Sequence, residues 1–505
     1  MDESRAGRLG WLLAGPLLAA AIMIFVDLVP GKPEVTRMAG VVVWMAIWWV
    51  TEPVHLAATA FVPIVAYPLL GLMPAKAVAP VYLDQISFLF IGAFIVALAM
   101  EKWGLHTRFA LQTVLVFGSS PRRLLLGFLL STGFLSMWMS NTAATMVMLP
   151  PVVAVLKKLE ERHGVERLQP LAVALYLSIA YAASIGGIGT LIGTPTNLVF
   201  VRLLHLLYPQ APELSFLRWM LLAAPIALVM LLACWGVLTT LYLRKLDVGP
   251  VDRASFREEY RQLGPPSYEQ KAVLIIAEVM ALLWVFRSDI DLGFIKLLGW
   301  TSLPFLKSAM IDDSTVAMLA ALALFIIPSR QRRGEALMTW RDANKLPWGI
   351  VMLFGGGFVL AKGFQATGLD VWCGDSLAHL GRLTPLVLAL TICLLLVFLT
   401  EFTANTSTVE LVLPILAAVA LTLQVNPLFM MVPATICASL GFMMPAGTAP
   451  NAIVFGTGRL TVRQMVRSGI LLNLTGALAT TVAVLTWGRH LFGGDLLQFP
   501  PWAVR

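Results

Sequence analysis

Long apolar runs separated by short polar segments dominate the sequence. Nine of these runs are uninterrupted and cover residues 10–30, 36–53, 55–73, 86–101, 217–243, 271–288, 314–328, 347–363 and 465–488. A helix of about 20 apolar residues crosses the roughly 30 Å hydrocarbon core of a bilayer. The pattern therefore predicts an all-α polytopic membrane protein.

Four further apolar stretches are interrupted near their middle by polar residues. The stretches are 122–157, 168–208, 384–424 and 427–458, and their polar breaks are 140–142, 186–197, 400–407 and 441–451. A helix can be interrupted at membrane depth only where the freed backbone is buried in protein or lines a cavity. Four such breaks in one chain predict discontinuous helices, and we expect these breaks to form the functional site.

The basic residues indicate how the chain is threaded. They cluster at Arg5 and Arg8, at Arg122 and Arg123, and within 157–167, 244–271, 330–345 and 459–467. If 122–157 re-enters as a helical hairpin, all of these clusters fall on one side, which the positive-inside rule makes cytoplasmic. This threading places the N-terminus in the cytoplasm and the C-terminus outside, and it sends 384–424 in from the opposite face as a second hairpin.

The two halves of the chain repeat each other. Asn141-Thr142 match Asn405-Thr406 at an offset of 405 − 141 = 264, and Phe90, Gly92 and Phe94 match residues 354, 356 and 358 at the same offset. Gly193-Thr194 match Gly447-Thr448 at an offset of 447 − 193 = 254. With the threading above, the copies have opposite orientations. Inverted repeats of this kind place a substrate site near the bilayer midplane, between discontinuous helices.

Composition and charge exclude several classes of protein. The 505 residues are 58% hydrophobic and only 13% charged, which rules out an ordinary soluble protein. The excess of basic residues, 36 − 28 = +8, indicates membrane orientation before it indicates any nucleic-acid partner. The four cysteines have no metal-binding spacing, and no HExxH motif or nucleophile–base set is present, so we expect no enzyme.

The breaks carry hydroxyls, amides and glycines but no basic residue, because 124–156, 168–201 and 383–458 contain neither Lys nor Arg. Carbonyls released at a helix break, with amide and hydroxyl oxygens, suit Na⁺, while the helix N-termini after the break favour an anion. An anion bound here must therefore be balanced by helix dipoles and bound cations. The duplication predicts a ligand with two anionic ends. Glu401 in the third break has two open interpretations: it carries a proton, or hydroxyls or loop N–H groups hold it as a carboxylate.

These motifs resemble the divalent anion/sodium symporter family, the sodium-coupled dicarboxylate, citrate and sulfate transporters. The similar stretches are FLSMWMSNTAATMVMLP, GGIGTLIGTPTN, TEFTANTSTVELVLPI and PAGTAPN, which begin at residues 134, 186, 400 and 445. The resemblance implies a homodimer with about 11 transmembrane helices per chain, two re-entrant hairpins and an elevator-type mechanism. It implies scaffold spans over 1–118 and 271–380, transport elements over 119–243 and 381–505, and a cytoplasmic linker over 244–270.

The resemblance also assigns site residues, motif by motif. It implies one Na⁺ site at Ser136, Ser140, Asn141 and Gly193, and a second at Thr400, Thr403, Asn405 and Gly447. It implies substrate contacts from Asn141, Thr142, Thr194, Asn405, Thr406 and Thr448. Two positions depart from the family pattern: Ala404 stands where the second motif has Ser, and Ala449-Pro450 differ from Pro195-Thr196 of the first copy.

The sequence thus predicts a secondary active transporter that moves a C4-type dicarboxylate such as succinate, malate or fumarate with two or more Na⁺ ions. Its partners are a small dianionic substrate, Na⁺ and the lipid bilayer, in a plasma membrane that we expect to be a bacterial inner membrane. Sulfate or citrate symport, Na⁺-independent dicarboxylate exchange, and proton-coupled antiport through Glu401 are the alternatives.

Overall fold

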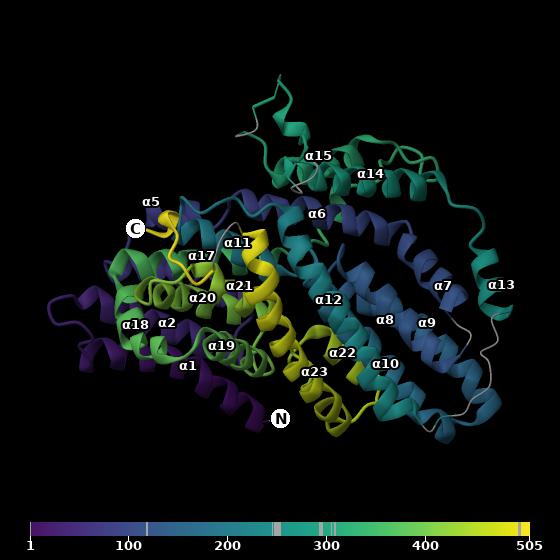
Figure 1. Ribbon diagram of the computed structural model, residues 1–505, viewed down its shortest axis with the longest axis horizontal. Coiled ribbons are helices and arrows are strands. Elements are labelled where there is room, and N and C mark those ends of the chain that lie inside the picture. The colour runs from purple at the N-terminus through teal and green to yellow at the C-terminus, as the bar shows by residue number, and fades with distance from the viewer. Residues whose placement is uncertain are drawn as a thin grey trace.

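The structure is a computed structural model that describes residues 2–117, 120–244, 246, 254–291, 296–304, 306–307, 310–492 and 496–504 (Figure 1). The described part of the chain is almost entirely helical. In the first half, the elements are α1 (Asp2–Phe25), α2 (Pro33–Thr51), α3 (Leu56–Thr59), α4 (Val62–Leu69), α5 (Ala75–Val78), η1 (Ala79–Val81), α6 (Gln85–Lys102), α7 (Leu105–Phe117), α8 (Pro121–Ser136), α9 (Asn141–His163), α10 (Val165–Gly187), α11 (Pro195–Leu207), α12 (Phe216–Leu238) and η2 (Thr239–Leu243).

The second half begins with a short linking helix and contains one two-stranded ladder. Its elements are α13 (Ala254–Gln262), α14 (Tyr268–Val285), β1 (Ile290–Asp291), β2 (Lys296–Leu297), η3 (Trp300–Ser302), α15 (Asp313–Ile326), α16 (Trp340–Ala343), α17 (Trp348–Thr367), α18 (Leu369–Ser376), η5 (Ala378–Arg382), α19 (Pro385–Leu399), α20 (Asn405–Thr422), α21 (Pro427–Cys437), α22 (Ala449–Phe455), α23 (Val462–Ala483), η6 (Val484–Gly488), α24 (Arg489–Leu491) and η7 (Pro501–Ala503). The strands β1 and β2 pair antiparallel.

Eight helical stretches in the described residues are long and apolar enough to cross a membrane, and five shorter apolar helices of 10–17 residues accompany them. The predicted class, an all-α polytopic membrane protein with discontinuous helices, is confirmed. Several spans differ in detail from the prediction. The run 55–73 forms two short helices, α3 and α4, because Pro63 starts a new helix after the bend at Ala60 and Phe61.

Two described helices longer than eight residues lie outside the predicted spans. The helix α7 occupies a segment that contains His106, Arg108 and Gln112 and is too polar to register as an apolar run. The helix α13 lies in the predicted linker 244–270, of which residues 245 and 247–253 fall outside the described part of the chain.

All four predicted breaks separate two helices. The helix α8 ends at Ser136 and α9 begins at Asn141, and α19 ends at Leu399 before α20 begins at Asn405. The helices α10 and α11 are separated by 188–194, and α21 and α22 by 438–448. Proline at the first positions of α11 and α22 favours a new helix start, because the missing N–H has no partner there anyway.

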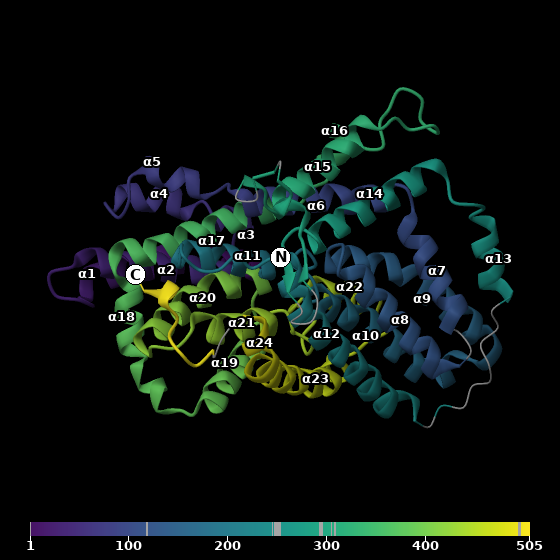
Figure 2. The same ribbon diagram turned by 45° about the horizontal axis from the view of Figure 1, so that its top comes forward.

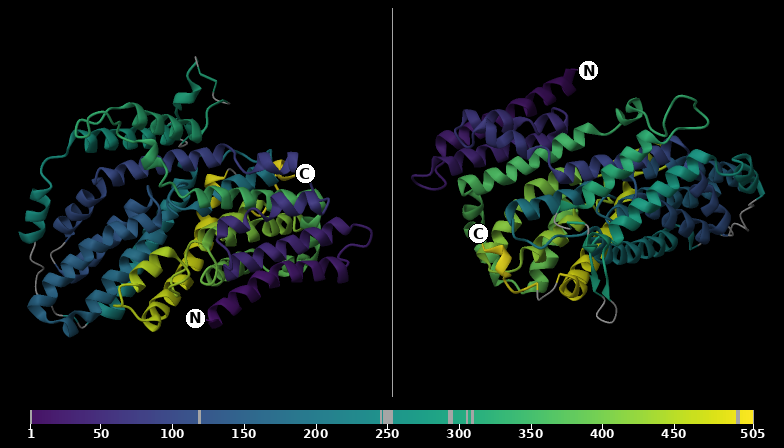
Figure 3. Two further views of the ribbon diagram at one scale, coloured as in Figure 1. Left: turned by 180° about the vertical axis from the view of Figure 1, so that it is seen from behind. Right: turned by 90° about the horizontal axis from the view of Figure 1, so that it is seen from above.

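The short half-helices of the two repeats are interleaved. The helix α22 from the second half packs against α9 and α10, while α11 from the first half packs against α20 and α21 (Figure 1). Figure 2 shows α4 and α5 along one side of the molecule, and the views in Figure 3 show α14 and α15 lying over α6. Hydrogen bonds join the halves, among them Tyr181 Oη to Met465 O (3.3 Å) and Gln169 Nε2 to Arg459 O (3.2 Å).

Candidate binding site at the paired helix breaks

The tip of the first hairpin is a closed hydrogen-bond network. Ser136 Oγ donates to Ala183 O of α10 over 2.7 Å. In the amide orientation that satisfies its neighbours, Asn141 Nδ2 donates to Ser136 Oγ (2.8 Å), Ala183 O (3.0 Å) and Gly193 O (3.3 Å). Ser140 caps α9, since its side chain accepts a hydrogen bond from Ala143 N over 3.2 Å. The tip therefore holds Asn141 against the break between α10 and α11.

The break between α10 and α11 is braced by an asparagine that sequence reasoning did not assign. Asn197 is fully buried, and its Nδ2 donates to Gly187 O (3.2 Å) and Thr190 O (2.7 Å). Trp219 Nε1 of α12 donates to Ile188 O in the same loop over 2.9 Å. These bonds satisfy carbonyls that the end of α10 would leave without partners.

The second hairpin repeats several hydrogen bonds of the first network. Thr400 Oγ1 lies 2.7 Å from Asn405 Oδ1 and donates to Ala438 O over 2.7 Å, and Thr400 stands 264 residues after Ser136. Asn451 Nδ2 donates to Gly441 O (3.1 Å) and Met444 O (3.0 Å), and these three residues stand 254 after Asn197, Gly187 and Thr190. The internal repeat is therefore preserved in the hydrogen bonds as well as in the sequence.

The two copies differ in which helix is capped. Ala404, where the first copy has Ser140, gives α20 no side-chain cap. Thr403 does not supply the missing hydroxyl at the helix end, because its Oγ1 donates to Leu399 O (2.9 Å) and contacts Thr408 Oγ1 (2.5 Å) within the hairpin. In the broken helices, the second copy has a side-chain cap and the first copy does not. Thr448 caps α22 by accepting from Asn451 N (3.3 Å), whereas Thr194 makes no cap on α11.

Glu401 is held as a carboxylate by loop N–H groups. It is fully buried, and it accepts hydrogen bonds from Phe442 N (2.7 Å), Met443 N (2.9 Å), Met444 N (2.8 Å) and Asn473 Nδ2 (2.8 Å). Asn473 lies on α23, so this helix also contributes a donor to the Glu401 carboxylate. Of the two interpretations left open by the sequence, the structure supports the anchoring role.

Glycines at the breaks leave cradles lined with oxygen atoms. A Cβ atom at Gly193 would lie 2.5 Å from Gly187 O and 2.9 Å from Ser136 O, and a Cβ atom at Gly187 would lie 2.3 Å from the side-chain amide of Asn141. In the second copy, a Cβ atom at Gly447 would lie 3.1 Å from Glu401 Oε2 and 3.3 Å from Glu401 O. Carbonyl and carboxylate oxygens are among the ligands that hard cations prefer, so the oxygen atoms that line both cradles fit Na⁺ chemically.

The remaining predicted substrate residues differ in their exposure: one lines a cavity, one is buried and one is half-buried. Thr142 lies with Ser140 in the wall of a cavity of about 580 Å³ between α6, α9 and residues 345–350. Thr194 is buried and lies 3.4 Å from Thr196 Oγ1, which contacts Ser439 Oγ (2.8 Å) from the other half. Thr406 is half-buried in the first turn of α20. The structure thus brings Ser136, Asn141 and Gly193 together at the first tip and Thr400 and Asn405 at the second, where Gly447 lies beside Glu401. It does not join all the predicted substrate residues in one cavity.

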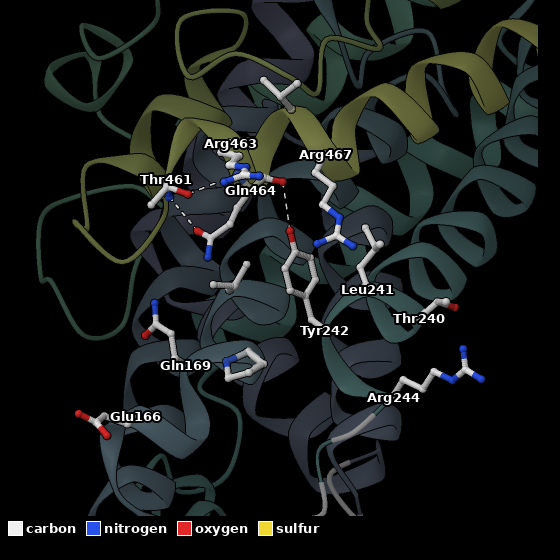
Figure 4. Close-up of a pocket in the computed structure, with 13 residues that line it drawn as sticks. Glu166, Gln169, Thr240, Leu241, Tyr242, Arg244, Thr461, Arg463, Gln464 and Arg467 are labelled. Carbon is white, nitrogen blue, oxygen red and sulfur yellow. Dashed lines mark hydrogen bonds between the residues drawn. The ribbon is translucent and has the colours of Figure 1, made fainter.

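A larger cavity, of about 1110 Å³, lies away from the breaks, at the ends of α10, η2 and α23 (Figure 4). Arg244, Arg463 and Arg467 line it, and Tyr242 Oη donates to Gln464 O there over 3.1 Å. None of the predicted site residues lines it. Volume alone does not locate the site in this molecule.

Paired hairpins whose polar tips pack against broken helices inside an apolar helical bundle define a polytopic membrane protein of the transporter class. The described part of the chain has the helices that such a protein needs. The chain belongs to the sodium:sulfate symporter family, because the family model described as the sodium:sulfate symporter transmembrane region matches residues 10–493.

Two relatives match nearly the whole chain. The sodium-dependent dicarboxylate transporter SdcS of Staphylococcus saprophyticus is 36% identical over 498 residues, covering 97% of this chain and 93% of its own. The Na⁺/citrate cotransporter of Rattus norvegicus is 35% identical and covers 97% of this chain and 96% of its own. These relatives are transporters, which confirms both the family resemblance and the prediction that the chain is not an enzyme.

Solved structures share the fold at low sequence identity. The YdaH transporter of Alcanivorax borkumensis, described as having an unusual topology, has a TM-score of 0.57 at 14% identity and covers 96% of this chain and 98% of its own. Neisseria gonorrhoeae MtrF has a TM-score of 0.55 at 15% identity and covers 92% of this chain and 96% of its own. The likeness supports the multi-pass, discontinuous-helix architecture.

Proposed function

We propose that this protein is a secondary active transporter that moves a C4-type dicarboxylate together with two or more Na⁺ ions. The observation that carries the proposal is the duplicated network at the two hairpin tips. Each tip offers amide, hydroxyl and carbonyl oxygens around a glycine cradle, and no Lys or Arg occurs in 124–156, 168–201 or 383–458. A dianion in such a site gains its counter-charge from bound cations and helix N-termini.

The residues are proposed to act as two matched sets. Ser136, Ser140, Asn141 and Gly193 hold one Na⁺, and Thr400, Thr403, Asn405 and Gly447 hold the second. Asn141, Thr142 and Thr194 meet one carboxylate of the substrate, and Asn405, Thr406 and Thr448 meet the other. The uncapped starts of α11 and α20 support this role, because backbone N–H groups at a helix start are donors suited to an anion.

An elevator-type movement is proposed for the two bodies of the chain. Bonds between halves tie the proposed transport elements, 119–243 and 381–505, into one body: Tyr181 to Met465, Thr196 to Ser439, and Tyr242 to Gln464. Trp103 Nε1 donates to Leu337 O (3.0 Å) and Lys102 pairs with Asp342 (2.7 Å) within the proposed scaffold, 1–118 and 271–380. A homodimer in a bacterial inner membrane, with a cytoplasmic N-terminus and an external C-terminus, completes the proposal.

The names of the relatives support carboxylates as the substrate class, and they keep citrate as the second candidate. The missing hydroxyl at Ala404 bears on this choice, because a hydrogen bond to a ligand contributes about 0.5–1.5 kcal/mol, up to about a tenfold difference in affinity. Sulfate symport and Na⁺-independent exchange are the other outcomes that the assay below separates.

The test is uptake of labelled succinate into proteoliposomes with an inward Na⁺ gradient, or with K⁺ in its place. Uptake that requires Na⁺ and is competed by malate or fumarate is the expected result. Uptake in K⁺ that needs dicarboxylate preloaded in the vesicles would instead identify an exchanger. No succinate flux, with citrate or sulfate taken up in its place, would overturn the C4 assignment.

Variants connect the activity to the site. Asn141→Ala and Asn405→Ala are each expected to abolish Na⁺-driven uptake in correctly folded protein. The matched control is Asn344→Ala, because Asn344 is exposed at the end of α16 and remote from both tips in sequence. Normal uptake by both tip variants would refute the site.

A further inference from the structure

A second glutamate in the second hairpin, Glu410, has a very different environment from Glu401. It lies on α20 and is fully buried, yet neither carboxyl oxygen has a hydrogen-bond partner among the described residues. Ser407, three residues earlier on the same helix, is also buried, and its Oγ is likewise without a partner. Residues three apart share one face of a helix, so these unpartnered oxygen atoms belong to one face of α20.

The backbone of α17 closes this face of α20. A Cβ atom at Gly357 would lie 2.3 Å from Glu410 Cδ and 2.8 Å from Glu410 Oε2. That contact places the backbone of α17 directly against the Glu410 carboxyl group. A proton is a cation that a carboxyl group can bind without further ligands.

Among the described residues, no salt bridge offsets a negative charge on Glu410. The helices packed on α20 are α2, α11, α17, α18 and α21. Their titratable and charged side chains are Glu34, Arg37, Arg202, His205, Lys362, Asp370, Cys373, Asp375 and Cys437. No ion pair in the described part of the chain reaches Glu410, and Arg202 pairs with Asp84 over 2.5 Å. Burying an unpaired carboxylate costs several kcal/mol, so the packed arrangement requires the neutral acid.

The first repeat shows the same helix face in an open arrangement. The counterparts of Ser407 and Glu410, at 407 − 264 = 143 and 410 − 264 = 146, are Ala143 and Met146. Both line the 580 Å³ cavity beside Ser140 and Thr142, and Met146 is 60% exposed. One hairpin is therefore open to a cavity while the other is packed shut on α17. In an inverted repeat, alternating access rocks one body against the other.

We propose that Glu410 is a proton-binding site that must be occupied before the second hairpin can pack against α17. Protonation thereby favours the arrangement seen here, and ionisation favours separation of α20 from α17. This inference deepens the proposed transport cycle and rests on it for the meaning of the hairpin movement. It adds pH as a control on one conformational step, at a position that the two predicted Na⁺ sites do not include.

The experiment is hydrogen exchange of the peptide covering 405–412 in the full-length protein in lipid nanodiscs, across pH 5 to 9 and corrected for intrinsic exchange. Protection of this peptide is expected to fall as pH rises in the wild type. In Glu410→Gln, which is neutral at every pH, protection is expected to stay constant. Equal pH profiles in the two proteins, or a wild-type profile that does not change with pH, would overturn the proposal.

A second variant and a control keep the result interpretable. Glu410→Met places the apolar side chain of the first repeat in the buried position, and it is expected to give the same flat profile if Glu410→Gln does not fold. Glu258→Gln makes the same chemical change at an exposed position of α13 and is expected to follow the wild type.

Because this exchange measurement needs no transport, it separates the inference from the proposed function. Na⁺-driven uptake without pH-dependent protection would refute only the role of Glu410. The ratio of Glu410→Gln to wild-type uptake at each pH is a second readout, in which the ionisation of the substrate cancels. A ratio that rises with pH supports the proposal, and a constant ratio contradicts it.

Discussion

Replacing Glu401 with Gln tests whether this residue anchors a loop or carries a proton. Its carboxylate accepts from Phe442 N, Met443 N, Met444 N and Asn473 Nδ2, all over 2.7–2.9 Å. These donors fix the chain between α21 and α22, where the second proposed Na⁺ cradle lies. In Glu401→Gln, the amide oxygen can keep the bonds made by Oε1, but the NH₂ group takes the place of Oε2 and faces Met444 N–H.

The magnitude follows from these contacts. A hydrogen bond to a charged group contributes about 1.5–3 kcal/mol, and a buried N–H left without a partner costs about 1–3 kcal/mol. The substitution is therefore expected to destabilise the folded protein by about 3–5 kcal/mol and to weaken the dependence of uptake on Na⁺ at the same time. Glu410→Gln is the matched comparison: its carboxyl oxygens have no partner to lose, so little destabilisation is expected at pH 6.

Thermal unfolding of the purified variants in detergent, measured with and without Na⁺, checks this reasoning. The expected result is a lower unfolding temperature and a smaller stabilisation by Na⁺ for Glu401→Gln than for the wild type or Glu410→Gln. A Glu401→Gln protein as stable as the wild type, with normal stabilisation by Na⁺, would refute the anchoring role. Loss of pH-dependent uptake alone, in a protein of full stability, would restore the proton-carrier interpretation.

Three further substitutions probe the site and the scaffold. Gly187→Ala places a Cβ atom 2.3 Å from a hairpin amide and should abolish Na⁺-dependent uptake, whereas Gly236→Ala, with nothing within 4 Å, should leave uptake unchanged in the same vesicles. Ala404→Ser restores an N-cap to α20 and should raise stability by about 0.5–2 kcal/mol, measured by thermal unfolding; no change would show that the helix end is already satisfied. Burial raises the pKa of Asp342, but hydrogen bonds from Lys102 and from a neighbouring threonine outweigh it and lower the pKa to about 2. Because the folded-state pKa is depressed, this stabilisation is present above about pH 4 and is lost as the pH falls towards 2, so the wild type and Asp342→Asn should differ in unfolding temperature at pH 7 and converge at pH 2. An equal difference at both pH values would contradict the ion pair.

Much of the site could be predicted from the sequence because its signals are local. Polar residues in the middle of apolar runs indicate all four breaks, because the backbone groups freed where a helix is interrupted need polar surroundings. The internal repeat in the sequence pairs each break of the first half with the equivalent break of the second half. Asn197 and Asn451 also carried a signal, because they occupy equivalent positions of the two loop motifs, but only the structure shows that they brace the loops from within.

The tertiary structure decided the features that depend on distant partners. The role of Glu401 could not be read from its own segment, because its N–H donors lie more than 40 residues further along the chain. Glu410 is likewise an ordinary helical glutamate in the sequence, and its lack of partners follows from the backbone of α17 closing over it. Hydrophobic pattern determines which segments enter the membrane and where they break, since each segment must satisfy its own backbone. Whether a buried carboxylate finds donors depends on how helices from both halves pack, and that is a property of the assembled fold alone.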